Sequence, residues 1–225
     1  MKRTAFSMLE LIFVIIVIGL LAALSIPNLN TNPLSDAAEQ VANHIRYTQH
    51  LAMVDDRFDS TNANWPSELW QIRFRSVKDY NNASEKEWFY EIFSDKSFDG
   101  DSTEQEEAKD PLTGESLGNG TFNNTVDDHK LINLTRKFGI KNIVISGGTN
   151  SYDSSQPRIA FDNIGRPYRN ALPNLGDDWH KLLLTSDMNI TLTGSDDQTS
   201  IITVKAETGY VCILDNTTGE CQGTK

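Results

Sequence analysis

Residues 6–27 read FSMLELIFVIIVIGLLAALSIP, an almost unbroken apolar run in which Glu10 is the only charged residue. A helix of this length, at about 1.5 Å per residue, reaches across the roughly 30 Å hydrocarbon core of a bilayer. Lys2 and Arg3 precede the run, and basic residues favour the cytoplasmic side. The sequence therefore predicts a transmembrane helix over 6–27, with a cytoplasmic N-terminus at the inner membrane and a periplasmic head. A secretory signal is the alternative, but the run is longer than the apolar region of such signals.

Glu10 needs an explanation, because a carboxylate in a membrane helix costs about 2.5–3.5 kcal/mol at the centre and less near an end. One explanation is a side chain that reaches the lipid headgroups. The other is a specific partner, and the neighbouring residues favour it. The string KRTA-FSMLEL resembles the N-terminal signal of type IV prepilins and type II secretion pseudopilins. In that family a short basic leader is cut before a Phe, the new N-terminus is methylated, and an acid is the fifth mature residue.

This resemblance implies cleavage between Ala5 and Phe6, methylation of Phe6, and a role for Glu10 in assembly. Glu10 would face the α-amino cation of Phe6 on a neighbouring subunit. Ala5 stands where the family usually has Gly. The implied partners are other pilin or pseudopilin subunits, a prepilin peptidase and methyltransferase, and an inner-membrane assembly platform. The implied function is that of a structural subunit, not an enzyme, in a type II secretion or type IV pilus-like filament.

The rest of the chain predicts an α+β fold. Gly19 and Pro27 weaken the first helix, so we expect either a break or a simple kink there. Residues 28–56 contain an apolar stripe at helical spacing and resemble the amphipathic half of the long helix of H-type minor pseudopilins. Residues 57–225 then predict a β-rich head, with strands over 70–75, 87–93, 141–146, 157–161, 181–186, 189–194, 200–206 and 210–214. With these segments, the resemblance implies a leader over 1–5 and a pilin-like long N-terminal helix packed on an antiparallel β-sheet head.

A polar insertion over 94–130 predicts a long surface loop. Its segment DKSFDGDSTEQE (95–106) matches the spacing of an EF-hand calcium loop. The candidate ligands of Ca²⁺ are Asp95, Ser97, Asp99, Asp101 and Glu106. The flanking sequence EWFYEIF is typical of a strand and not of the helix that precedes such loops. A solvated acidic loop without metal is therefore the alternative, and no other cofactor is indicated.

Charge and cysteines limit the remaining functions. The formal net charge of -11 repels nucleic acid, so we expect the clusters Arg73/Arg75/Lys78 and Arg158/Arg166/Arg169 to form cross-strand salt bridges and not to bind DNA. Cys212 and Cys221 predict one disulfide in an oxidising compartment, or else two free thiols. No pattern of catalytic residues is present. Two alternatives stay open: an anchored calcium- or ligand-binding module that does not polymerise, and a DNA-uptake pilin.

Overall fold

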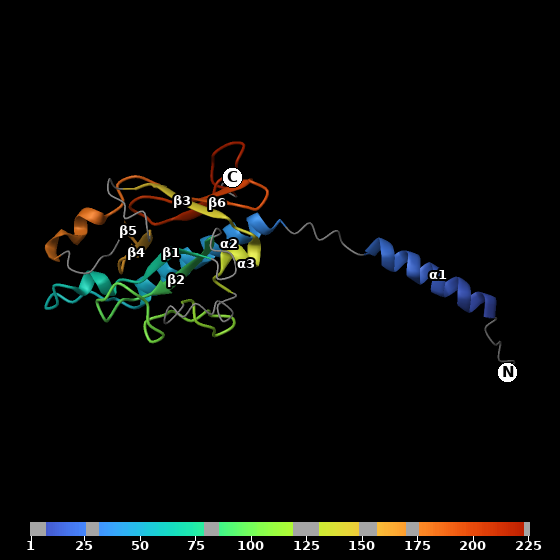
Figure 1. Ribbon diagram of the computed structural model, residues 1–225, viewed down its shortest axis with the longest axis horizontal. Coiled ribbons are helices and arrows are strands. Elements are labelled where there is room, and N and C mark those ends of the chain that lie inside the picture. Colours follow the sequence, from blue (N-terminus) through green and yellow to red (C-terminus); the bar gives the residue numbers. More distant parts are fainter. Residues whose placement is uncertain are drawn as a thin grey trace. The chain divides into compact units, whose positions relative to one another are not determined.

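The computed structural model describes residues 8–25, 32–78, 86–118, 131–148, 157–169 and 176–222. The chain divides into two compact units, Met1–Asn32 and Pro33–Lys225. The first unit contains helix α1 (Met8–Ser25), and the second begins with helix α2 (Pro33–Val54) and contains all the strands (Figure 1). We refer to the second unit as the head.

The prediction of one long N-terminal helix packed on a single sheet is wrong. α1 ends at Ser25, α2 begins at Pro33, and the two helices belong to different units. Proline lacks a backbone N–H and has its φ angle fixed, so Pro33 is suited to the first turn of a new helix. Gly19 lies inside α1 and does not end it, while Pro27 lies outside the described residues.

The transmembrane prediction is also corrected. No helix among the described residues is long and apolar enough to cross a membrane. α1, which lies inside the predicted span, has 18 residues. A transmembrane helix and a single-pass inner-membrane location are therefore not supported.

The head contains two four-stranded antiparallel sheets where a single sheet was expected. The first has the strand order β2-β1-β4-β5 and is built from β1 (Gln71–Lys78), β2 (Lys86–Phe93), β4 (Arg158–Phe161) and β5 (Pro167–Arg169). The second has the order β3-β6-β7-β8 and is built from β3 (Asn142–Gly147), β6 (Met188–Thr193), β7 (Thr199–Val204) and β8 (Val211–Ile213). Most neighbours are joined as hairpins, and β1 also pairs with β4 from a distant part of the chain.

Seven of the predicted strands form within a few residues of the expected bounds, and the strand over 181–186 does not. The first two residues of that segment belong to a 3-10 helix, η3 (Gly176–Leu182). The next residue, Leu183, forms an isolated bridge with Tyr168. β5 was not predicted, because its three residues begin with a proline and carry no alternating pattern. β5 lies at a sheet edge, where a proline is tolerated because its missing N–H faces no partner strand.

α2 connects the two sheets. The predicted apolar stripe is confirmed, and its buried residues are Ala37, Ala38, Val41, Ala42, Ile45, Thr48 and Ala52. Four of these seven are alanines, so the helix can approach both sheets closely, and it contacts β1, β4, β6, β7 and β8 (Figure 1). The side chain of Arg46 also donates to the carbonyl oxygen of Val211 in β8, at 2.9 Å. One continuous core therefore joins α2 to both sheets.

A polar network lies where α2 meets β2. The hydroxyl of Tyr90 is 2.6 Å from both Gln40 Nε2 and His44 Nδ1, and His44 Nε2 lies 3.7 Å from the carboxylate of Asp110. Burial lowers the pKa of His44, against the opposing attraction of Asp110. Burial also raises the pKa of Tyr90. The hydroxyl therefore stays protonated and keeps a donor at the centre of the network.

Part of the predicted surface loop is packed against the free edge of β2. The amide of Ile92 donates to the carbonyl oxygen of Leu117, and the amide of Ala108 donates to the carbonyl oxygen of Ile92, both at 2.8 Å. Leu117 is fully buried. The described residues 94–118 of the insertion therefore continue the fold, which differs from the solvated loop that their polar composition suggested.

A second, smaller apolar cluster lies on the face of the first sheet that is turned away from α2. It consists of Trp65, Leu69, Ala160 and Tyr168, with Trp179, Leu182 and Leu183 packed against it. The 3-10 helix η1 (Trp65–Glu68) supplies Trp65, and η3 supplies Trp179 and Leu182. The short helix α3 (Leu134–Phe138) lies elsewhere, beside β2.

Candidate functional site

α1 is apolar on every side and exposes its apolar side chains. Nine large apolar residues in it have exposed fractions between 43% and 82%: Met8, Leu9, Leu11, Ile12, Phe13, Val14, Ile15, Ile16 and Ile18. Consecutive residues of a helix point about 100° apart, so these nine surround the helix axis. A helix that is hydrophobic all round is stable in water only when it is buried against something else.

Glu10 lies in the first turn of α1, where a carboxylate is favourable because the helix dipole is positive at that end. The side chain is exposed. Ala5 and Phe6, the predicted cleavage and methylation residues, lie outside the described residues. Their predicted roles stay predictions.

The predicted calcium loop over 95–106 folds around its own backbone donors. Asp95 accepts a hydrogen bond from the amide of Gly100 at 3.0 Å. Glu106 accepts from the amides of Ser97 and Thr103, at 2.7 and 3.1 Å. Burial raises the pKa of Asp95, and the two hydrogen-bonded carboxylates hold the turn that Gly100 makes at a φ of 82°.

An arginine from the sheet supplies positive charge beneath this loop. Nη1 of Arg73 donates to the carbonyl oxygen of Gly100 at 2.5 Å and lies 3.2 Å from the carboxylate of Asp101. Asp99 accepts from the amide of Asp101. Among the described residues, no three or more His, Cys, Asp or Glu side chains are grouped so that they could hold a metal ion. Calcium binding at this loop stays a prediction.

Two arginines of the first basic cluster, Arg73 and Arg75, form the predicted cross-strand salt bridges with Glu91, while the side chain of Lys78 lies outside the described part. Arg73 pairs with Glu91 on the adjacent strand β2, with Nη2 2.6 Å from the carboxylate, and both side chains are almost fully buried. Arg158 and Arg169 are also buried, and burial lowers the pKa of Arg158 to about 10. Arg166 pairs with Asp162 at 2.7 Å. Buried and paired guanidinium groups are poorly placed to contact DNA phosphates, which weakens the DNA-uptake alternative.

The disulfide between Cys212 and Cys221 is confirmed. Cys212 is buried in β8, and the bridge closes the turn that follows it. Asp215 caps that turn by accepting from the amides of Thr217 and Thr218, at 2.8 and 2.9 Å.

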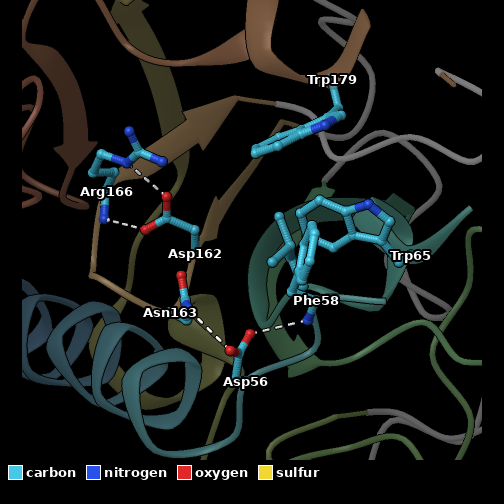
Figure 2. A pocket seen from close by; sticks show the side chains of 8 residues that line it. Asp56, Phe58, Trp65, Asp162, Asn163, Arg166 and Trp179 are labelled. Atoms are coloured by element: carbon cyan, nitrogen blue, oxygen red, sulfur yellow. Dashed lines mark hydrogen bonds and ion pairs between the residues drawn. The ribbon is translucent and has the colours of Figure 1, made fainter. Parts of the chain in front are cut away.

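A pocket of about 270 Å³ lies at the end of α2, where four segments of the head converge (Figure 2). Its residues come from the segment after α2, from η1 and its C-cap, from the turn between β4 and β5, and from η3. They are Asp56, Phe58, Trp65, Leu69, Asp162, Asn163, Arg166 and Trp179. Sequence reasoning missed this pocket, because the residues lie far apart in the chain and match no local motif.

Three aromatic rings form one wall of this pocket. The ring of Phe58 meets that of Trp65 edge to face, with centroids 5.0 Å apart and an interplanar angle of 73°. Trp65 meets Trp179 at 4.7 Å and also at 73°. Figure 2 shows the three rings turned toward the same space. We refer to Phe58, Trp65 and Trp179 as the aromatic wall.

Two carboxylates form the opposite wall. Asp162 accepts from the amide of Arg166 at 2.8 Å, from its Nε at 2.7 Å, and from the hydroxyl of Tyr168 at 3.1 Å (Figure 2). Asp56 accepts from the amide of Phe58 at 3.0 Å and from Nδ2 of Asn163 at 2.9 Å. The charge of Asp162 is thus balanced by a guanidinium, whereas the groups that hold Asp56 are neutral.

The turn between β4 and β5 contains Gly165 at a positive φ of 83°, a conformation that glycine adopts without strain. An added Cβ at Gly165 would lie 3.0 Å from Nε2 of Gln49 and 3.3 Å from Sδ of Met53. The turn therefore packs closely on the end of α2, and this contact holds Asp162 and Asn163 at the pocket.

Comparisons with known proteins do not identify a relative. No family model matches the chain, and neither a curated protein nor a solved structure does. The disulfide that the sequence suggested is supported, and no membrane-spanning helix is found among the described residues. The resemblance to pilins therefore depends on the sequence of the N-terminal motif and of residues 28–56.

Proposed function

We propose that this chain is a structural subunit of a filament of the type IV pilus or type II secretion kind, assembled through α1. The observation that carries this proposal is the exposure of nine large apolar side chains around α1. Water disfavours such a surface by roughly 25 cal/mol for each Å² of apolar area. Copies of α1 packed side by side in the core of a filament would remove that surface from water.

The division of the chain into two units supports the same proposal. The head has its own core, formed by α2 and the two sheets, and the described residues of that core all belong to the second unit. α1 belongs to the other unit, so its apolar side chains could pack against other subunits. The acidic composition of the chain, with a net charge of -11, would keep heads on the outside of a filament soluble.

Glu10 would set the register between subunits. Cleavage before Phe6 creates an α-amino cation about one helical turn from Glu10, and the same cation on a neighbour could pair with this carboxylate. A charge pair among apolar helices is stronger than one in water, because the effective dielectric constant is lower. A subunit shifted along its neighbour would leave the carboxylate buried without that cation.

The first test is the mass of the N-terminal peptide, measured on chain produced with and without a prepilin peptidase. We expect a start at methylated Phe6 only when the peptidase is present. A retained Met1 under both conditions would remove the maturation route, and with it the assignment to this family of filaments.

The second test is self-association of the matured full-length chain, followed by sedimentation and negative-stain microscopy. We expect Ile15→Asp to abolish filaments, because it buries a charge among packed helices. Leu112→Asp is the matched control, since Leu112 is 93% exposed in the head. Filaments that form equally well with Ile15→Asp would refute assembly through α1.

A further inference from the structure

We propose that the pocket at the end of α2 binds a lysine side chain presented by a partner polypeptide. At about 270 Å³ the pocket is at or below the lower end of the roughly 300–1,000 Å³ that is typical of sites for small-molecule ligands. That size suits one long side chain better than a complete cofactor or metabolite.

The aromatic wall favours a cation. The two ring pairs in it each meet edge to face at 73°, so the rings present their faces in different directions and do not form one flat platform. A sugar ring or a nucleobase stacks best on the open, flat face of an aromatic ring. A compact ammonium group is attracted to the face of each ring, and it gains most when several faces surround it.

The charges around the pocket favour the same ligand. The carboxylates of Asp56 and Asp162 line the pocket, against the one guanidinium group of Arg166. Arg166 pairs with Asp162, whereas Asp56 is held by neutral donors. The lining of the pocket therefore keeps one negative charge. The net charge of -11 on the whole chain adds to the attraction for a cation.

The surroundings indicate that the lysine belongs to a polypeptide. Four large apolar side chains lie beside or within the pocket and are 55–71% exposed: Met53, Val54, Phe58 and Ile164. Met53 also lies against the turn that carries Asp162 and Asn163. Clusters of exposed apolar side chains mark contact surfaces for proteins. A lysine flanked by apolar residues would fill the pocket and cover this rim together.

This proposal is independent of the filament proposal, since it concerns the head and not α1. The test uses full-length chain kept in solution with a non-ionic detergent. The probes are a blocked peptide Gly-Leu-Lys-Leu-Gly, the same peptide with norleucine or glutamate in place of lysine, and tetramethylammonium. Binding is followed by the indole N–H signals of the four tryptophans in two-dimensional NMR.

We expect the lysine peptide to shift the indole signals of Trp65 and Trp179 but not that of Trp88. Its affinity should exceed that of the norleucine peptide by about fivefold, the effect of one partly desolvated cation–π contact. Asp56→Asn should remove most of this preference. Glu104→Gln, which removes an exposed carboxylate elsewhere in the head, should leave it unchanged.

Trp179→Leu should weaken the lysine peptide by about fivefold. Trp88→Leu is its control, because the Trp88 indole lies on β2 and donates to the carbonyl oxygen of Lys141, away from the pocket. The proposal would be overturned if the norleucine peptide bound as tightly as the lysine peptide or more tightly. It would also be overturned if the glutamate peptide bound more tightly than the lysine peptide, or if no probe shifted the indole signals. Tetramethylammonium that binds as tightly as the lysine peptide would overturn the assignment to a polypeptide partner.

Discussion

Arg73 holds together the sheet and the acidic loop above it, and its replacement gives the sharpest test of the fold. The guanidinium donates through Nε and Nη2 to one carboxylate oxygen of Glu91, at 3.0 and 2.6 Å. Through Nη1 it donates to the carbonyl oxygen of Gly100, and it lies over the ring of Phe93, 4.8 Å from the centroid. The side chains of Arg73 and Glu91 are 0% and 1% exposed.

Arg73→Met keeps the apolar stem and removes every one of these contacts. Among the described residues, the cation that then remains beside Glu91 is the partly exposed Arg75, at 3.5 Å. Removal of one partner from a buried ion pair typically costs about 3–5 kcal/mol, because the other charge stays buried. We expect a loss of that size in the free energy of unfolding, measured by urea denaturation. We also expect faster hydrogen exchange at the amides of Gly100 and Thr103.

The double variant Arg73→Met/Glu91→Leu separates the buried charge from the lost packing. Because it removes both charges, it should recover about 1–3 kcal/mol relative to the sum of the two single losses. Lys205→Met is the control, since Lys205 and Asp187 form an exposed pair that is worth about 0–1 kcal/mol. Additive losses in the double variant, or a loss in Arg73→Met no larger than in the control, would refute this reasoning.

Three further outcomes follow from the head. Cys212→Ala/Cys221→Ala should lower the free energy of unfolding by about 2–3 kcal/mol, because the disulfide closes a short loop. A loss near zero in urea denaturation would show that the disulfide does not stabilise the head. Burial lowers the pKa of His44 below 6.5, so the unfolded chain binds a proton more readily, and stability should fall as the pH drops below about 6.5. His44→Gln should flatten that slope in urea melts between about pH 5 and pH 7.5, and an unchanged slope would assign the effect to other groups. Gly147→Ala should lower the free energy of unfolding by about 1–3 kcal/mol more than Gly114→Ala does. Both glycines have a positive φ, but of these two it is Gly147 whose new Cβ would lie 2.2 Å from a backbone oxygen. Equal melting temperatures of the two variants would contradict this prediction.

Local patterns predicted most elements of the head. The spacing of Val41, Ile45 and Ala52 identified the buried face of α2, and alternation identified β1 and β6. The paired cysteines predicted the disulfide, and Arg73 was expected to form a cross-strand salt bridge. These features depend on residues close in sequence, or on one pair of cysteines or of opposite charges. The spacing of apolar residues and the residue types themselves are enough to predict them.

What depended on distant contacts was not predictable. The division into two sheets requires that β1 pair with β4 and that α2 lie against both sheets, and no local pattern encodes either choice. The pocket combines Phe58, Trp65 and Trp179 across more than 100 residues of sequence. Each is an ordinary aromatic residue until the fold brings the three together.

The covered edge of β2 bears on how copies of this chain can meet. An open strand edge is a template for sheet growth between molecules, and it competes with any ordered assembly. Here the carbonyl and amide of Ile92 are both engaged by the segment that carries Ala108 and Leu117. A chain that concentrates at high local density along a polymer gains from such a cover, because crowded heads are then less able to cross-link through that edge. The acidic insertion thus covers the edge of β2, where the first sheet could otherwise pair with a strand of another molecule.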